Sequence, residues 1–200
     1  MSAIRDLFVT RLYEASLTAE RGWDALRADL ADACAMLAAE DHAGRAWCKA
    51  KGYGGYTSYA SLGDLPRRAT AFGDLKRSLD KHAAAFAKQL DFDLGGGRLA
   101  LDSLWASVLK PGAAHSGHIH PHSVLSGTIY VTVPPGAGAL RLEDPRLPLM
   151  MAAPPRASFV NLTPAPGTLF MWESWLRHEV LAGAAKTPRV SLSFNYAWQG

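Results

Sequence analysis

The chain has 200 residues, of which 48% are hydrophobic and 20% are charged. This composition predicts a folded chain with a substantial core and excludes a mainly disordered protein. The net charge is +3 and the basic residues form no run, so we expect no nucleic-acid partner.

The cysteines and the first residues bear on the cellular compartment. Cys34 and Cys48 are the only cysteines, which indicates reduced thiols rather than a disulfide scaffold. No apolar run approaches the length of a membrane span. Arg5 and Asp6 interrupt the stretch in which a signal peptide needs a continuous apolar core. We therefore expect a cytoplasmic protein without a membrane partner.

The first half of the chain is expected to be mainly helical. Residues 7–17 begin with alternating apolar side chains and predict a short strand. From Trp23 onward apolar residues recur every three or four positions, which predicts an amphipathic helix. The same spacing predicts a helix over 75–90, with His82 on its polar flank as a surface residue rather than a metal ligand. Residues 51–68, rich in glycine and tyrosine, are expected to form an ordered loop.

The second half, after three consecutive glycines, is expected to be strand-rich. The predicted strands are residues 98–110, 126–133, 138–144, 167–174, 177–183 and 188–198. Short strands separated by Pro, Gly and Asp indicate a closed or sandwiched antiparallel sheet. The expected fold class is therefore α+β and mainly β. We expect one domain over residues 1–200, in which residues 1–97 pack on a core formed by residues 98–200.

Four of the seven histidines lie in the stretch HSGHIHPH, residues 115–122. Side chains two apart in a strand face the same side, so His118 and His120 would present two imidazoles to one divalent ion. The proline after His120 favours an extended backbone there. His120 and His122 have the same spacing, so the register stays open by two residues. His115 is expected in an exposed turn.

His178 is the remaining histidine of the second half. A lone H-x-H pair is a weak signal, and an isolated His178 is more simply a structural histidine at a strand edge. A metal site on a β-barrel scaffold, however, forms when one strand supplies two ligands and a distant strand supplies the third. Taken together, the three histidines predict a metal site.

Arg189 and Ser191 are two residues apart on a predicted strand and should face the same side. A guanidinium with a neighbouring hydroxyl suits a carboxylate, because arginine offers a planar bidentate fork. An inward-facing arginine is costly unless it meets an anion. The alternative is a structural salt bridge to Glu or Asp.

With these residues assembled, the second half resembles the Fe(II)/2-oxoglutarate-dependent oxygenases, and within them a branch found in bacteria and phages. The matching segments are HIHPHSVLSGTIYV (118–131), LEDPR (142–146), PAPGTLFMWESWLRHEV (164–180) and RVSLSFN (189–195). The resemblance covers residues 98–198. It implies a double-stranded β-helix (jelly-roll) core supported by the N-terminal helices, with Fe(II) as cofactor and 2-oxoglutarate as co-substrate.

The resemblance also implies residue roles. His118, His120 and His178 would hold the iron. Arg189, helped by Ser191, would receive the distal carboxylate of 2-oxoglutarate, and Tyr130 is a further candidate for the same pocket. No catalytic side chain beyond the metal ligands is implied. Trp105, Trp172 and Trp175 could line an apolar pocket, although large aromatics in a sheet protein are more often core.

Two departures from the family's pattern stand out. Most of the superfamily has a carboxylate where His120 stands, so the ligands are either three histidines or two histidines and an acid. An acid ligand would have to be Glu143, Asp144 or Glu173. Glu173 itself occupies a position where the family's pattern has proline.

Other functions fit the same residues. A cupin-like metalloenzyme would use three histidines without 2-oxoglutarate, and a zinc hydratase or hydrolase would use them to activate water. A non-catalytic metal-binding jelly-roll protein belongs to a different class. The expected partner is a small-molecule or peptide substrate, and a homodimer is an open alternative.

Overall fold

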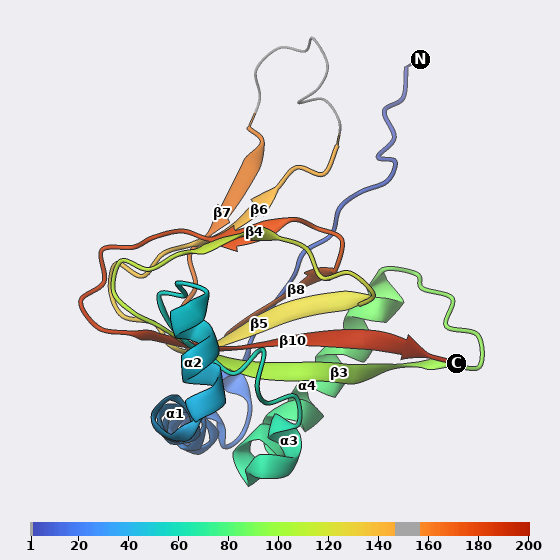
Figure 1. Cartoon of the computed structure of the whole chain (residues 1–200). Helices are drawn as coiled ribbons and strands as arrows, with labels where there is room; N and C mark the ends of the chain where they lie inside the picture. The colour runs from blue at the N-terminus through green and yellow to red at the C-terminus, as the bar shows by residue number, and fades with distance from the viewer. Residues whose placement is uncertain (1, 147–156) are drawn as a thin grey trace.

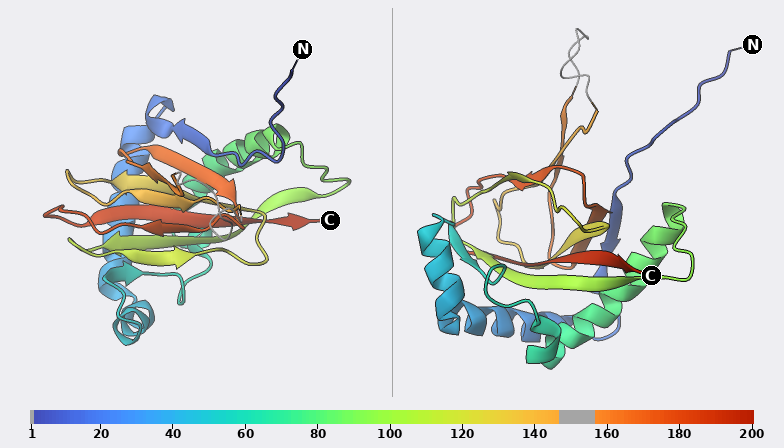
Figure 2. Two further views of the ribbon diagram at one scale, coloured as in Figure 1. Left: turned by 90° about the horizontal axis from the view of Figure 1, so that it is seen from above. Right: turned by 45° about the vertical axis from the view of Figure 1, so that its right-hand side comes forward.

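The computed structural model describes residues 2–146 and 157–200. Two antiparallel sheets lie face to face, and helices cover the outer side of the larger sheet (Figure 1). The turned views show the same three layers of small sheet, large sheet and helices (Figure 2).

The larger sheet has the strand order β1-β8-β5-β10-β3-β2 and the smaller one β4-β9-β6-β7. The strands of the larger sheet are β1 (Tyr13–Ser16), β2 (Gly55–Thr57), β3 (Arg98–Leu109), β5 (Leu125–Thr132), β8 (Thr168–Glu173) and β10 (Arg189–Gln199). Those of the smaller sheet are β4 (His115–His118), β6 (Leu140–Glu143), β7 (Phe159–Leu162) and β9 (His178–Val180). Strands β3 to β10 cross between the sheets at every step except the β6–β7 hairpin, which makes them the expected double-stranded β-helix.

The helices belong to the first half of the chain. They are α1 (Trp23–Glu40), α2 (His42–Ala50), α3 (Leu65–Arg68) and α4 (Thr70–Gln89), with a 3-10 turn at Leu17–Ala19. Asp41 separates α1 from α2: its backbone N–H bonds the carbonyl of Leu37, and its side chain accepts the N–H of Gly44 at 2.9 Å. This cap ends one helix and starts the next.

Alternation along the central strands decides what each face of the larger sheet contacts. In β10, Leu192 and Phe194 are buried in the core shared with α1 and α4. Ser191 and Ser193 alternate with them along the strand and line the space between the two sheets. Since side chains alternate along a strand, the apolar side chains of this part of β10 face the helices and its serines face the smaller sheet.

The predicted elements are largely confirmed, with the following corrections. The strand expected within 7–17 covers only Tyr13–Ser16, and the loop expected over 51–68 contains β2 and α3. Helix α2 and the short strand β7 were not predicted. His82, expected on the surface, is partly exposed, and its ring lies between the Tyr13 hydroxyl, 2.8 Å away, and Glu20, 3.1 Å away.

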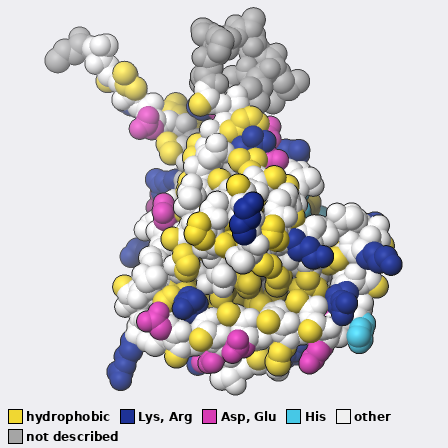
Figure 3. Space-filling view, turned by 90° about the vertical axis from the view of Figure 1, so that its left-hand side faces the viewer, with side chains coloured by type: hydrophobic (Ala, Val, Ile, Leu, Met, Phe, Trp, Pro, Cys, Tyr) yellow, Lys and Arg dark blue, Asp and Glu magenta, His cyan; other side chains and the backbone are white. Residues whose placement is uncertain are grey.

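The structure also bears on the expectations drawn from the cysteines, the hydropathy and the charges. Cys34 and Cys48 are buried free thiols. None of the helices within residues 2–146 and 157–200 combines the length and hydrophobicity that a transmembrane helix needs. On the face drawn in Figure 3, Lys and Arg side chains are spread out and Asp and Glu lie among them.

Candidate metal centre

The smaller sheet brings three histidines of the described chain together. His118 ends β4 and His178 begins β9, and the two are register partners across the antiparallel pair. His120 follows two residues after the end of β4, where its backbone N–H bonds the carbonyl of Ser174 at 3.0 Å. One potential ligand atom from each histidine lies within 4.8 Å of the others.

Hydrogen bonds orient two of these rings for metal binding. Nδ1 of His118 lies 2.8 Å from the Ser116 carbonyl, and Nδ1 of His178 lies 2.9 Å from the Leu176 carbonyl. A carbonyl oxygen only accepts, so each Nδ1 carries the proton and each Nε2 keeps its lone pair.

The spacing of the nitrogens also fits one ion. Nε2 of His120 lies 3.3 Å from Nε2 of His178. Two imidazole nitrogens that each bind the same ion at about 2.1 Å, with angles near tetrahedral, stand roughly 3.4 Å apart. The chemistry and the geometry of the three side chains therefore fit a divalent transition metal.

Burial keeps these imidazoles neutral. Burial, with the neighbouring His118 adding to it, lowers the pKa of His178 to about 3 and that of His120 to about 4. Burial also lowers the pKa of His118. A metal ligand must be the neutral imidazole, so these rings need not lose a proton before they bind an ion at neutral pH.

The structure corrects the expected register of the histidine cluster. His120 lies beyond β4 rather than in it, because the chain turns at His122, whose φ is +70°. His122 is exposed and lies outside the group of three. The exposed turn expected for His115 is wrong: this residue begins β4, is half-buried and stacks on the His118 ring at 4.4 Å.

The candidate acids lie elsewhere. Glu143 pairs with Arg177 at 2.9 Å and Asp144 pairs with Arg146 at 2.7 Å. Glu173 lines a different hollow, near Leu90. In the part of the chain that the structure describes, the group of potential ligands contains the three histidines and no carboxylate.

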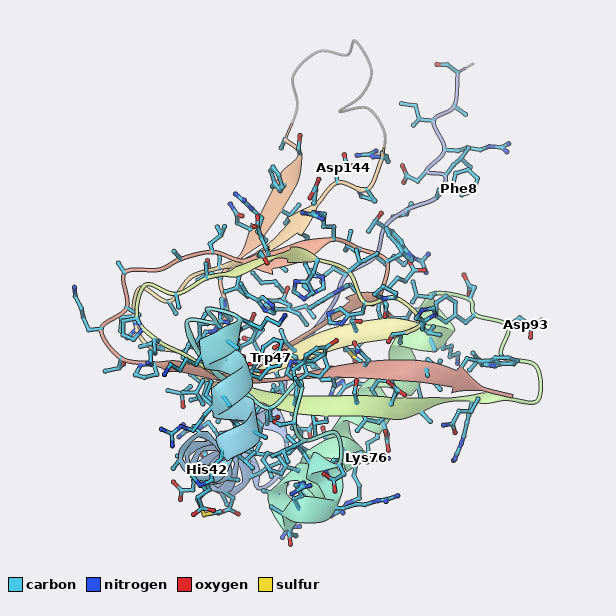
Figure 4. All side chains as sticks on the ribbon, viewed as in Figure 1. Phe8, His42, Trp47, Lys76, Asp93 and Asp144 are labelled. Carbon is cyan, nitrogen blue, oxygen red and sulfur yellow. The ribbon has the colours of Figure 1, made fainter. Side chains whose placement is uncertain are left out.

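A cavity between the two sheets joins the histidines to Arg189. Figure 4 shows side chains filling this space above β5 and β10. Its lining comes from both sheets and from the loop before β2, and includes Tyr53, Trp105, Ser107, His118, His120, Thr128, Tyr130, Trp172, His178, Arg189, Ser191 and Ser193. The expected site residues therefore all border one space.

Arg189 is a buried cation whose charge is not neutralised by the described residues. Its side chain is 7% exposed, and its guanidinium carbon lies 5.4 Å from the centre of the Tyr130 ring. Nη1 donates to the carbonyl of Gly138 at 3.3 Å, but Nε has no hydrogen-bond partner. Within residues 2–146 and 157–200 no carboxylate lies within 4.0 Å of it, so the structural salt bridge considered as an alternative is absent there. Because an unpaired buried charge is costly, this arrangement fits an anionic ligand.

Sequence reasoning missed part of this pocket. Ser107 is the register partner of Ser191, which is in turn the partner of Tyr130, so three hydroxyls lie side by side across β3, β10 and β5. Tyr53 also lines the cavity, and burial raises the pKa of Tyr53. The sequence contains a signal for Ser107, because this polar residue stands between apolar residues in β3. Tyr53 lies in the stretch interpreted as a loop and carried no such signal.

Comparisons with known proteins agree with this site. Residues 103–195 match the model of the family described as "Putative 2OG-Fe(II) oxygenase", and the match includes every expected site residue. No curated protein matches the chain in sequence.

Solved structures share the fold at low sequence identity. A prolyl-4-hydroxylase from Pseudomonas putida is 20% identical, with a TM-score of 0.63 over 96% of this chain and 94% of the other. The non-heme alpha-ketoglutarate-dependent epimerase SnoN from nogalamycin biosynthesis is 14% identical, with a TM-score of 0.63 over 94% and 76%. HygX from Streptomyces hygroscopicus, solved with nickel and 2-oxoglutarate bound, is 12% identical, with a TM-score of 0.59 over 94% and 82%.

The fold, the histidine group, the buried arginine and the family match thus agree. The chain is therefore similar to the Fe(II)/2-oxoglutarate-dependent oxygenases, in sequence over residues 103–195 and in fold over most of its length.

Proposed function

We propose that this protein is an Fe(II)- and 2-oxoglutarate-dependent dioxygenase in which His118, His120 and His178 hold the iron. The observation that carries this proposal is the convergence of the three side chains, with the Nδ1 protons of His118 and His178 fixed on backbone carbonyls. Three ligands on one side of an ion leave other positions open for a co-substrate and oxygen.

We propose that Arg189 receives the distal carboxylate of 2-oxoglutarate, with Ser191 and Tyr130 beside it. Support comes from the unpartnered Nε of Arg189 and from the cavity that joins it to the histidines. Arg189 would fix the position and the orientation of the co-substrate, because a bidentate ion pair restrains both.

The residues around the cavity limit the access of water. Tyr130, Phe170, Trp172 and Leu176 are buried together between the sheets. When bound, Fe(II) and 2-oxoglutarate would supply the electrons that activate molecular oxygen, the oxidant with which an oxygenase hydroxylates an unactivated C–H bond. The role of this chain is to bind, orient and enclose them.

We propose a small molecule or a peptide as the substrate. The named structural neighbours include a prolyl-4-hydroxylase and an epimerase from nogalamycin biosynthesis, which catalyse different reactions. We also propose that the protein works in the cytoplasm, where its two free buried thiols stay reduced.

The test is the Fe(II)- and oxygen-dependent conversion of 2-oxoglutarate to succinate by the purified protein. The proposal predicts that succinate forms, and that neither His178→Ala nor Arg189→Ala supports it at the wild-type rate. Oxygen uptake that needs no 2-oxoglutarate would favour the cupin-like alternative. Stoichiometric iron without turnover or 2-oxoglutarate binding would favour the non-catalytic one.

A further inference from the structure

Two buried side-chain atoms of the described residues lack a hydrogen-bond partner, and both border the same cavity. They are Nε of Arg189 and Nε1 of Trp172. Both atoms are donors. A buried donor without an acceptor costs free energy, so its presence indicates a ligand that brings acceptors. Arg189 has an assigned role, whereas the indole of Trp172 has none so far.

Trp172 lies at the metal end of the cavity. It is 2% exposed and sits in β8 opposite Ser126 of β5. Its ring packs edge-on against the His178 imidazole, with 4.6 Å between the ring centres and 61° between the planes. An aromatic ring is a weak acceptor, so this contact does not replace a hydrogen bond.

Packing alone does not require the indole nitrogen. The neighbours of Trp172 in the buried cluster between the sheets include Leu140, Leu142 and Leu176, against which a phenylalanine ring would also pack. The contrast with Trp198 is informative: Trp198 is 55% exposed, yet its Nε1 donates to the Leu94 carbonyl at 3.1 Å. The buried indole therefore lacks the partner that even a surface indole of this chain has.

We propose that the Nε1–H of Trp172 donates a hydrogen bond to an oxygen at the metal-binding end of 2-oxoglutarate. This inference rests on the proposed function. The keto and carboxylate oxygens at that end only accept hydrogen bonds, and the distal carboxylate meets Arg189. A single acceptor-rich dianion then satisfies both unpartnered donors, one at each end of the cavity.

The first experiment is an anaerobic titration of the Fe(II)-loaded protein with 2-oxoglutarate, followed by visible absorption. Trp172→Phe keeps an aromatic ring and removes the donor. Its Kd for 2-oxoglutarate should rise roughly tenfold or more, as expected when a hydrogen bond to a charged group is lost. Trp175→Phe is the matched control, because Trp175 is 46% exposed and does not line the cavity. Its Kd should stay within about twofold of wild type.

Two further readouts separate ligand binding from a structural role. The ligand-free Trp172→Phe protein should have a Tm equal to or above that of wild type, because the substitution removes an unpartnered buried donor. In the Zn(II)-loaded wild-type protein labelled with ¹⁵N, one of the six indole N–H resonances should shift downfield and exchange more slowly when 2-oxoglutarate is added. That resonance should be assigned to Trp172.

The outcomes are distinct. If wild type binds 2-oxoglutarate, Trp172→Phe binds it equally well and the Trp172 resonance does not move, the inference is overturned and the proposed function stands. If wild type shows no saturable binding, the proposed function fails and the inference fails with it. If Trp172→Phe does not fold, the resonance of the wild-type protein decides.

Discussion

Replacing Arg189 with methionine should separate ligand affinity from stability. Arg189→Met keeps an unbranched side chain of similar length and removes the buried charge. Truncating one member of a buried charge pair costs about 2–5 kcal/mol of binding free energy. The Kd for 2-oxoglutarate should therefore rise between about 30-fold and several thousand-fold.

The stability of the ligand-free protein, in contrast, should not fall much. The substitution forfeits one hydrogen bond to Gly138, worth about 1 kcal/mol, and the contact over the Tyr130 ring. It also removes a desolvated cation, and replacing buried ionic groups by apolar ones is often neutral or stabilising by about 1–4 kcal/mol. We expect a free energy of unfolding within about 1 kcal/mol of wild type, or above it.

Urea unfolding with and without 2-oxoglutarate, on Zn(II)-loaded protein, measures both effects. At 100 times its Kd, the ligand should raise the unfolding free energy of wild type by about 2.7 kcal/mol and leave Arg189→Met nearly unchanged at the same concentration. Arg68→Met is the control, because Arg68 forms only an exposed helical ion pair with Asp64. The reasoning is refuted if Arg189→Met loses more than about 2 kcal/mol without ligand and still binds 2-oxoglutarate normally.

Three other substitutions test the site and the fold. Loss of a hydrogen-bond partner of a metal ligand costs roughly 10- to 100-fold in metal affinity, and His178→Ala, which removes a ligand itself, should lower iron affinity by more than that. The control His122→Ala, at an exposed position, should keep the wild-type iron content. Equal iron in the two variants, by metal analysis, would contradict the ligand assignment. Gly127→Ala should destabilise by about 1–3 kcal/mol, because a Cβ there would stand 2.5 Å from the Phe194 ring, and an unchanged thermal midpoint would refute this packing argument. Burial opposes the charge of Asp41, but hydrogen bonds from a serine, a backbone N–H and a tyrosine outweigh it and lower its pKa. The stability that this carboxylate contributes is present above about pH 4 and is lost as the pH falls through the lower pKa of the folded state. Asp41→Asn should therefore lower the free energy of unfolding by about 1 kcal/mol at pH 7 and by less in acid. A loss that does not change with pH would show that the charge of Asp41 plays no part.

The long elements were predictable because their periodicity is strong. The helix from Trp23 and strands β3, β5 and β10 have apolar residues at regular spacing over many positions. Short strands such as β7, with four residues, give too few alternations to be recognised. Helix α2 was missed because it has only nine residues and its start depends on the side chain of Asp41, which accepts the N–H of Gly44.

At the site, residue types were predictable but conformation was not. The spacing of His118 and His120 indicated a metal pair, and both lie in the group of three. The spacing predicted that both lie in one strand. In the structure the chain turns at His122, where φ is positive, and the Ser174 carbonyl holds the backbone N–H of His120. The bond to Ser174 depends on a segment far along the chain. Tyr53 joins the pocket for the same reason, through the pairing of β2 with β3.

The anaerobic titration of the Fe(II)-loaded protein with 2-oxoglutarate tests the central claim most directly. The account predicts a saturable charge-transfer absorption band at one 2-oxoglutarate per iron, absent in His178→Ala and shifted to far higher concentration in Arg189→Met. Stoichiometric iron with no band at any concentration of 2-oxoglutarate would contradict it.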